Sequence, residues 1–361
     1  MDIKTIKTIE SATEKSISSF AKLSLSLLFL LAVFLWTYSS HGKVPDNTFL
    51  IIGAIFGAYM ALNIGANDVA NNVGPSVGAK ALTLTGAIII AGIFESAGAI
   101  IAGGDVVNTI KSGIIDPNLI TDKNSFIWAM TAGLLAGAVW LNFATSIGAP
   151  VSTTHAIVGG VMGAGIASAG FSILNWGSLF EIASSWIISP LLGGIVAAGF
   201  LYFIKKQIVY KENMLEQAQK FVPILIAIMT WAFTTYLILK GLKQLINIGF
   251  YSASGISILF AIVAYYLTKN SIEKNLSNLT NDRSSVNKLF TPALIFGAAL
   301  LSFAHGANDV SNAIGPLAAI NDAIMHGGTS VQASVPFWIM FVGAIGIVIG
   351  LVLYGPRLIK T

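Results

Sequence analysis

Cysteine is absent from the 361-residue chain, and charged residues make up only 10% of it. The lack of cysteine excludes disulfides, thiolate nucleophiles and cysteine-ligated metal sites. Soluble domains carry roughly 25% charged residues, so the low charge and the mean hydropathy of +0.79 exclude a fold surrounded mainly by water. The four histidines are scattered along the chain and cannot assemble a nucleophile with its base and orienting group, so we expect no enzyme.

Arginine is nearly absent as well, since Arg283 and Arg357 are the only two, and both flank apolar runs. An anion inside the membrane therefore cannot be clamped by guanidinium groups and must rely on helix ends, hydroxyls, amides and bound cations. The remaining positive charge gathers in short segments outside the apolar runs, which is typical of cytoplasmic loops. This pattern predicts a cytoplasmic N-terminus and argues against a nucleic-acid partner.

Apolar runs recur at about the 20 residues needed to cross a hydrocarbon core roughly 30 Å thick. No alternating segments typical of a membrane barrel occur, so we predict an all-α, multi-pass membrane protein. The first run follows a basic tail and is interpreted as a retained anchor helix. The runs lie near residues 23–38, 49–64, 82–103, 126–145, 156–170, 177–204, 221–240, 253–268, 291–304 and 335–354.

An internal repeat is the strongest signal in the chain. Residues 65–75 read GANDVANNVGP and residues 306–316 read GANDVSNAIGP, with eight identities in eleven positions. The charge pattern predicts that the first copy enters the membrane from outside and the second from inside. We therefore expect two inverted-topology repeats with a binding site where they meet. The predicted division is a tail and anchor helix (1–48), a first repeat (49–204), linking spans with basic loops (205–290) and a second repeat (291–361).

Each copy of the motif combines residue types that interrupt helices, so broken helices are expected at residues 67–75 and 308–316. Asp68 and Asp309 lie inside these segments, and a buried carboxylate in the membrane needs a partner. Their oxygens suit Na⁺, and they could also accept a hydrogen bond from protonated phosphate, which sulfate cannot donate. The predicted shared site therefore binds phosphate and a cation.

A third polar break, GAPVSTTHAIVGG, spans residues 148–160 and predicts a re-entrant hairpin. Ser152, Thr153 and Thr154 precede a glycine-rich apolar stretch, where N-cap hydroxyls and free backbone N–H groups suit a tetrahedral oxyanion. Ordinary helix capping is the simpler reading of one of these three residues. For His155 and His305 we predict a packing role.

With these motifs, the chain closely resembles the inorganic phosphate transporter (PiT) family from about residue 49 to its end. The resemblance implies a symporter of inorganic phosphate with Na⁺ or H⁺, working by alternating access in the bacterial inner (plasma) membrane. It needs no further cofactor and is compatible with a homo-oligomer. By motif, the resemblance assigns phosphate to Asp68, Ser152, Thr153, Thr154 and Asp309, the coupling cation to Asn67, Asn71, Asn308, Asn312 and Glu95, and Na⁺ to Asn67, Asp68, Asn308 and Asp309.

Two features depart from the family pattern. An alignment of Gly98-Ala99 with Gly343-Ala344 places Met340 where a second glutamate would match Glu95. No second hydroxyl run follows Asp309, so we expect a truncated second repeat, either because the chain is a fragment or because the site is half built. A sulfate permease of the same superfamily and an uncoupled anion channel remain as alternatives.

Overall fold

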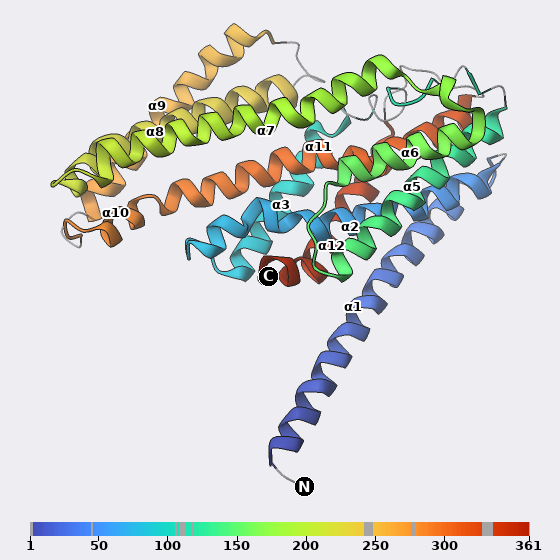
Figure 1. The fold of residues 1–361 in the computed structure, drawn as a ribbon, viewed down its shortest axis with the longest axis horizontal. Coiled ribbons are helices and arrows are strands. Elements are labelled where there is room, and N and C mark those ends of the chain that lie inside the picture. The colour runs from blue at the N-terminus through green and yellow to red at the C-terminus, as the bar shows by residue number, and fades with distance from the viewer. Residues whose placement is uncertain are drawn as a thin grey trace. The chain divides into compact units, whose positions relative to one another are not determined.

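The computed structural model describes residues 3–44, 46–104, 107, 113–116, 119–120, 122–241, 248–275, 279–326 and 335–360, with side chains from residue 18 onward. Within these ranges the chain is almost entirely helical, and the extended pairing is limited to an isolated bridge between Ile115 and Leu174. Nine helices of the described part are long and apolar enough to cross a membrane. These spans confirm the predicted all-α, multi-pass membrane fold (Figure 1).

The helices form two compact units. The first comprises Met1–Gly74, Leu84–Asn175 and Ser302–Thr361, and the second comprises Pro75–Thr83 and Trp176–Leu301. Helices of the first unit are α1 (Ile3–His41), α2 (Asn47–Gly78, up to Gly74), α3 (Leu84–Ala102), α5 (Lys123–Ser146), α6 (Thr153–Ala169), α11 (Thr291–His326, from Ser302) and α12 (Phe337–Lys360).

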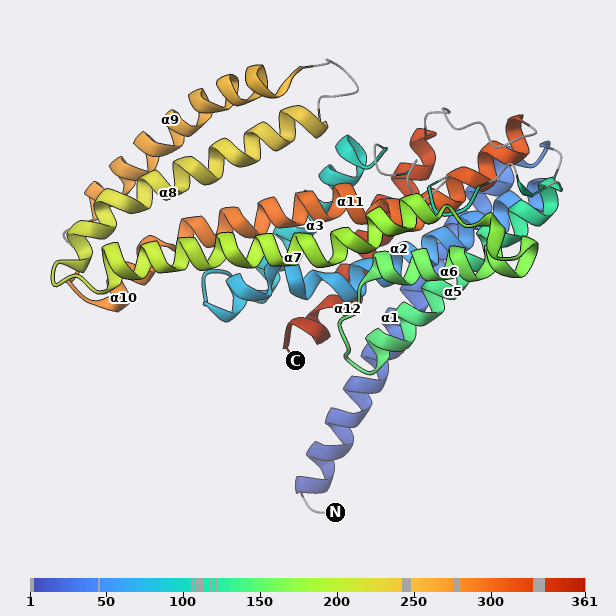
Figure 2. The same cartoon turned by 45° about the horizontal axis from the view of Figure 1, so that its top comes forward.

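Helix α1 contacts α12, while its N-terminal half extends away from the other helices of the first unit (Figures 1 and 2). The Ser26 and Tyr354 hydroxyls lie 3.0 Å apart, and the Trp36 and Trp338 rings lie 5.2 Å apart between centroids. The exposed apolar surface of α1 is the surface expected of a helix that faces lipid.

Helices α2 and α11, which carry the two motif copies, run antiparallel. Gly53 near the start of α2 lies beside Ile320 near the end of α11, whereas Asp68 further along α2 lies beside His305. Both helices were expected to break within the motif, and the structure corrects this, because α2 and α11 are continuous through residues 67–75 and 308–316. Neighbouring helices and side chains stabilise Gly and Pro inside membrane helices. Here Asn67 and Asn312 of the motif bond to other elements rather than to their own backbone.

The glycine that opens each motif copy is a point of close helix contact. A Cβ on Gly65 would lie 1.9 Å from the carbonyl oxygen of Ile347 on α12, and a Cβ on Gly306 would lie 2.0 Å from the carbonyl oxygen of Glu95 on α3. Only a residue without a side chain fits such an approach. The repeated Gly is therefore used for packing rather than for a turn.

A second pair of glycines gives the same correspondence. A Cβ on Gly98 of α3 would meet the carbonyl oxygen of Phe303, and a Cβ on Gly350 of α12 would meet that of Leu62. Phe303 follows Leu62 by the same 241 residues that separate the two motif copies. The contacts of α3 on α11 thus match those of α12 on α2.

This correspondence changes the residue that stands opposite Glu95. The sequence alignment places Met340 there, but the matched contacts place Ile347 there. Helix α12 contains several glycines, so a Gly-Ala pair alone could not fix its register. In either register an apolar residue stands at this position, so the second glutamate is absent.

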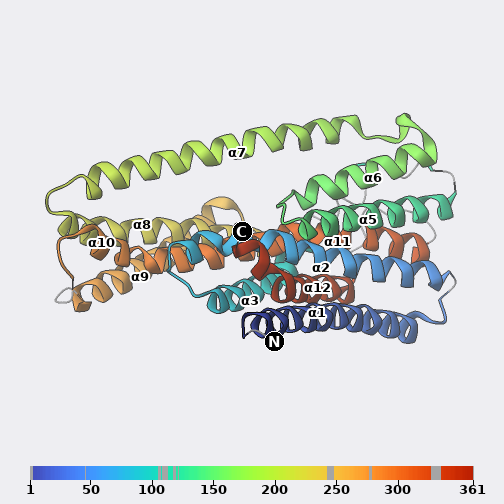
Figure 3. The same ribbon diagram turned by 60° about the horizontal axis from the view of Figure 1, so that its bottom comes forward.

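The predicted hairpin is present as α5 and α6, which pack side by side (Figure 3). Asp122 caps α5, and its pKa is lowered by hydrogen bonds from the backbone and hydroxyl of Ser125. Helix α6 has Ser152 as its N-cap, whose side chain accepts a hydrogen bond from the His155 backbone at 3.2 Å. The hydroxyl run therefore begins a helix, as predicted.

The second unit contains the basic connections. Its helices α8 and α9 lie side by side (Figure 2). Asn281, before α10, accepts a hydrogen bond from the Leu215 backbone and donates one to the Glu212 carbonyl, so both basic connections lie at one end of this unit. The helices are α7 (Trp176–Ile204) with a π-helical turn (Lys205–Val209), α8 (Met214–Tyr236) with a second π-helical turn (Leu237–Gly241), α9 (Phe250–Asn275), α10 (Arg283–Leu289) and α11 up to Leu301.

The close contact at Gly350 predicts an unequal response to alanine. Gly350→Ala forces a methyl group against the Leu62 carbonyl and should cost about 1–3 kcal/mol of unfolding free energy, as overpacking does. Gly159→Ala on α6 is the matched control, because nothing lies within 4 Å of its Cβ position. Thermal unfolding in detergent should show a lower midpoint for Gly350→Ala alone, and equal midpoints would contradict the packing.

Candidate functional site

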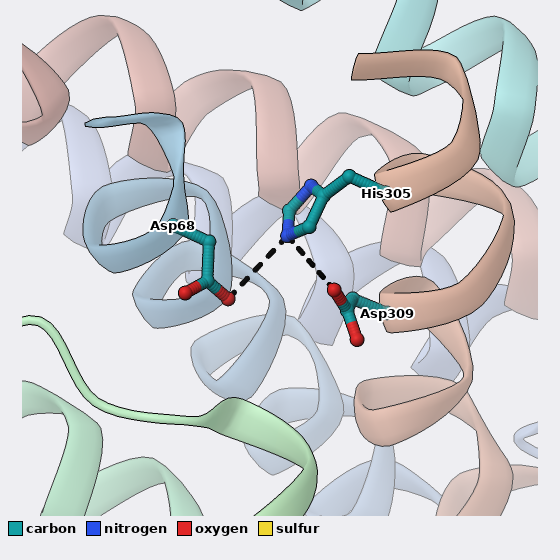
Figure 4. A group of neighbouring side chains, drawn as sticks. All are labelled: Asp68, His305 and Asp309. Atoms are coloured by element: carbon teal, nitrogen blue, oxygen red, sulfur yellow. Dashed lines mark hydrogen bonds and ion pairs between the residues drawn. The ribbon is translucent and has the colours of Figure 1, made fainter. Parts of the chain in front are cut away.

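The two motif aspartates meet at His305. The Nε2 atom of His305 lies 3.4 Å from Oδ2 of Asp68 and 3.0 Å from Oδ2 of Asp309 (Figure 4). Asp68 comes from α2, whereas His305 and Asp309 lie one turn apart on α11, and the antiparallel packing of these helices brings them together. The packing role predicted for His305 is therefore incomplete, since the ring bridges both candidate site carboxylates.

The hydroxyl run lies against the second motif copy. The Thr154 hydroxyl donates to Oδ1 of Asp309 at 3.3 Å. The buried Asn312 amide donates to the Thr153 and Thr154 hydroxyls at 3.2 and 3.1 Å and to Asp309 at 3.0 Å. Asn312 thus joins the start of α6 to α11, and Ser152 lies at the adjoining N-cap.

Asn67 holds the hairpin from the side of α2. Its side-chain oxygen accepts a hydrogen bond from the Val151 backbone at 2.9 Å, and its amide donates to the Thr145 hydroxyl at 2.9 Å and the Ala149 carbonyl at 3.1 Å. Asn67 is fully buried, and each polar atom of its side chain already has a protein partner. The structure therefore places this asparagine as a clamp on the turn that carries the hydroxyls, not as an open ligand.

A cavity of about 520 Å³ connects these groups. Asp68, Asp309, His305 and Asn71 line it from α2 and α11, and the turn and first residues of α6 line it opposite. The hydroxyl-bearing residues in its wall are Ser152, Thr153 and Thr154. The structure therefore brings all five predicted phosphate ligands to one cavity.

The cavity has an acidic character. Its wall holds two carboxylates and one imidazole, and no lysine or arginine is among the described residues that line it. One ligand atom each from Asp68, His305 and Asp309 lie within 4.8 Å of one another, a spacing that could hold a cation. Carboxylate oxygens are hard ligands that suit Na⁺, so the two aspartates fit such an ion, whereas an anion alone would be repelled.

The remaining predicted residues are distributed differently. Glu95 is fully buried on α3, outside the lining of the cavity, where it accepts a hydrogen bond from Asn72 at 2.7 Å. Asn308 is exposed on α11, whereas its counterpart Asn67 is buried, and neither residue lines the cavity. His155 is exposed, and its backbone takes part in the Ser152 cap.

Two roles in this arrangement were not predicted from the sequence, that of His305 as a bridging group and that of Asn72 as the partner of Glu95. One signal could have pointed to His305, because it lies four residues before Asp309 and so shares its helix face. Asn72 has alanine at its counterpart, position 313, so the repeat gave no signal for it.

A helical membrane fold with a polar cavity between two related helices defines a multi-pass membrane transporter. Residues 64–361 match the model of the phosphate transporter family. A candidate phosphate permease of Helicobacter pylori strain J99 is 51% identical over 364 residues, covering 100% of this chain and 68% of that protein. A candidate phosphate permease of Pyrococcus furiosus is 36% identical over 312 residues, covering 86% of this chain and 75% of that protein.

A solved structure titled the sodium-dependent phosphate transporter superposes with a TM-score of 0.81 at 32% sequence identity. It covers 87% of this chain, and this chain covers 77% of it. The chain therefore belongs to the phosphate transporter family, which consists of transporters rather than enzymes.

The Asn67 clamp can be tested by hydrogen exchange. Asn67→Ala removes the acceptor of the Val151 amide and should speed exchange at Val151 and lower the unfolding free energy by about 2–4 kcal/mol, since buried polar groups are left unpaired. Asn71→Ala is the matched control because Asn71 is exposed and lies one turn further along α2. Unchanged protection at Val151 in the Asn67 variant would contradict the clamp.

Proposed function

We propose that the chain carries inorganic phosphate across the membrane together with Na⁺ or H⁺. The observation that carries this proposal is the single cavity in which the hydroxyls of α6 face Asp68 and Asp309. The family membership supports it, and so does the similarity to a solved sodium-dependent phosphate transporter. Phosphate, the coupling cation and the lipid bilayer are the partners.

The start of α6 supplies the anion side of the proposed site. Helix N-termini have unpaired backbone N–H groups and a partial positive charge, both of which favour anions. Thr153 and Ser152 add hydroxyls that can donate to phosphate oxygens. The Thr154 hydroxyl donates to Asp309 in this structure and would have to turn in order to donate to phosphate. This arrangement replaces the arginine clamp that the chain lacks.

The aspartates supply selectivity and the cation side. A protonated phosphate can donate a hydrogen bond to Asp68 or Asp309, whereas sulfate has no proton to give at neutral pH, so a carboxylate left unpaired disfavours sulfate. The same carboxylates attract the coupling cation. Moving two negative charges into a cell against about 100 mV costs roughly 4.6 kcal/mol, at about 2.3 kcal/mol per charge, and co-transported cations offset this cost.

The helix contacts support an inverted-repeat mechanism. The antiparallel α2 and α11 and the matched contacts of α12 and α3 are the relations expected of two inverted copies. In such transporters one repeat moves against the other around a fixed site, which gives alternating access. The basic connections gathered at one end of the second unit agree with a cytoplasmic location for that end. The basic residues of the N-terminal tail favour a cytoplasmic N-terminus by the same rule.

Uptake of radiolabelled phosphate into proteoliposomes tests the function. We expect accumulation when a Na⁺ or a pH gradient is imposed, each in a separate experiment, and no inhibition by excess sulfate. Flux that follows the phosphate gradient without a cation gradient would indicate a channel. Competition by sulfate at equal concentration would indicate a sulfate permease.

Replacement of the aspartates tests their role. Asp68→Asn and Asp309→Asn should each lower phosphate uptake at least tenfold, the loss expected when a buried acceptor is removed from a polar site. The uptake that remains in these variants should also be inhibited more strongly by sulfate. Glu181→Gln, an exposed carboxylate-to-amide change on α7, is the control and should leave uptake unchanged. Full uptake and full sulfate rejection in both Asp variants would disprove the role.

A further inference from the structure

A buried chain of polar contacts leads from the cavity into the helix core. The Nε2 atom of His305 faces Asp68 and Asp309. Its other ring nitrogen, Nδ1, lies 3.4 Å from Oε1 of Glu95, which is an ion-pair distance, and Nδ1 has no hydrogen-bond partner among the described residues. The same Glu95 oxygen accepts the hydrogen bond from Asn72. The imidazole therefore has carboxylates on both sides, two toward the cavity and one behind it.

Glu95 is held away from the cavity by packing. It is 0% exposed, and its backbone carbonyl is covered by Gly306, one residue after His305. Its second oxygen, Oε2, has no hydrogen-bond partner among the described residues. A buried carboxylate with an unpaired oxygen costs about 1–3 kcal/mol, so its presence calls for a function rather than for a stabilising role.

The geometry assigns Glu95 as a positioning residue: we propose that it holds the His305 ring with Nε2 between Asp68 and Asp309, and that it affects transport only through this ring. This inference rests on the proposed phosphate site and adds a specific role to it. Carboxylates behind a functional imidazole commonly fix the orientation of the ring and which nitrogen carries a proton. Asn72 in turn fixes the Glu95 carboxylate.

The alternative is that Glu95 binds the coupling cation itself, as the family resemblance implies. Three observations favour the positioning role: the side chain has no exposure, it is absent from the cavity lining, and its carboxylate lies at ion-pair distance from the His305 ring. The His305 ring lies between Glu95 and the cavity aspartates, with Nδ1 toward Glu95 and Nε2 toward Asp309.

A double-mutant cycle separates the two roles. Four purified proteins are compared: the unmodified protein, Glu95→Gln, His305→Asn and the double variant. For each, we would measure equilibrium binding of radiolabelled phosphate, the KM of phosphate uptake and the dependence of uptake on cation concentration (the cation activation curve). Loss of a residue behind a functional ligand typically costs on the order of 10- to 100-fold, so we expect Glu95→Gln to weaken phosphate binding by at least tenfold. The double variant should bind within about twofold of His305→Asn alone, because a residue that acts through the ring has no effect once the ring is gone.

The cation activation curve gives a second readout. If Glu95 acts only through His305, the Glu95→Gln variant couples the same number of cations to each phosphate. The steepness of the plot of uptake against cation concentration is then unchanged. Loss of one cation from the stoichiometry, or losses that multiply in the double variant, would overturn the assignment.

Two further variants keep the test decisive if Glu95→Gln does not fold. Asn72→Ala retains the Glu95 charge and should give a smaller rise in phosphate KM that disappears in the His305→Asn background. A rise that persists there would also overturn the assignment. Ser96→Ala, whose hydroxyl bonds within its own helix, is the matched control and should behave as the unmodified protein. If the unmodified protein itself takes up no phosphate under either gradient, the proposed function fails, and that outcome is distinct from failure of the positioning role.

Discussion

The contact between His305 and the aspartates of both motif copies is the constraint on which the site depends. Two carboxylates held near one another in the membrane repel each other, and each is costly to bury. The imidazole between them gives both a partner, and it can do so only because α2 and α11 pass antiparallel at this level. The glycines that precede the aspartates allow the flanking helices to approach closely enough to enclose this group.

The asparagines of the motif connect this helix pair to the hydroxyl run. Asn67 binds the turn before α6 from one side, and Asn312 binds its first threonines from the other. The hairpin is thus fixed by one asparagine from each copy, and its hydroxyls are presented to the aspartates. A motif that reads as a set of ligands therefore also forms the frame that positions the ligands of a different segment.

Much of this arrangement could be predicted from the sequence, and the failures have physical causes. The apolar runs, the doubled aspartates and the cap at Ser152 each depend on local residue types, so they were predictable. The continuity of α2 and α11 was not, because Gly, Asn and Pro break an isolated helix, whereas here neighbouring elements satisfy them. The roles of His305 and Glu95 depend on which helices pack together. A single sequence does not specify that packing.

The two motif copies are nearly identical in sequence but not in environment. The Asp68 side chain is 8% exposed, whereas the Asp309 side chain is 23% exposed and receives the Thr154 hydroxyl. Glu95 stands behind the ring on one side, and its counterpart Ile347 is apolar. If Asp68 and Asp309 had identical surroundings, the cavity would offer both aspartates equally to a bound solute. The unequal surroundings make Asp309 the more open carboxylate and Asp68 the more enclosed one, so the two copies of the motif contribute acidic groups of different access to one cavity.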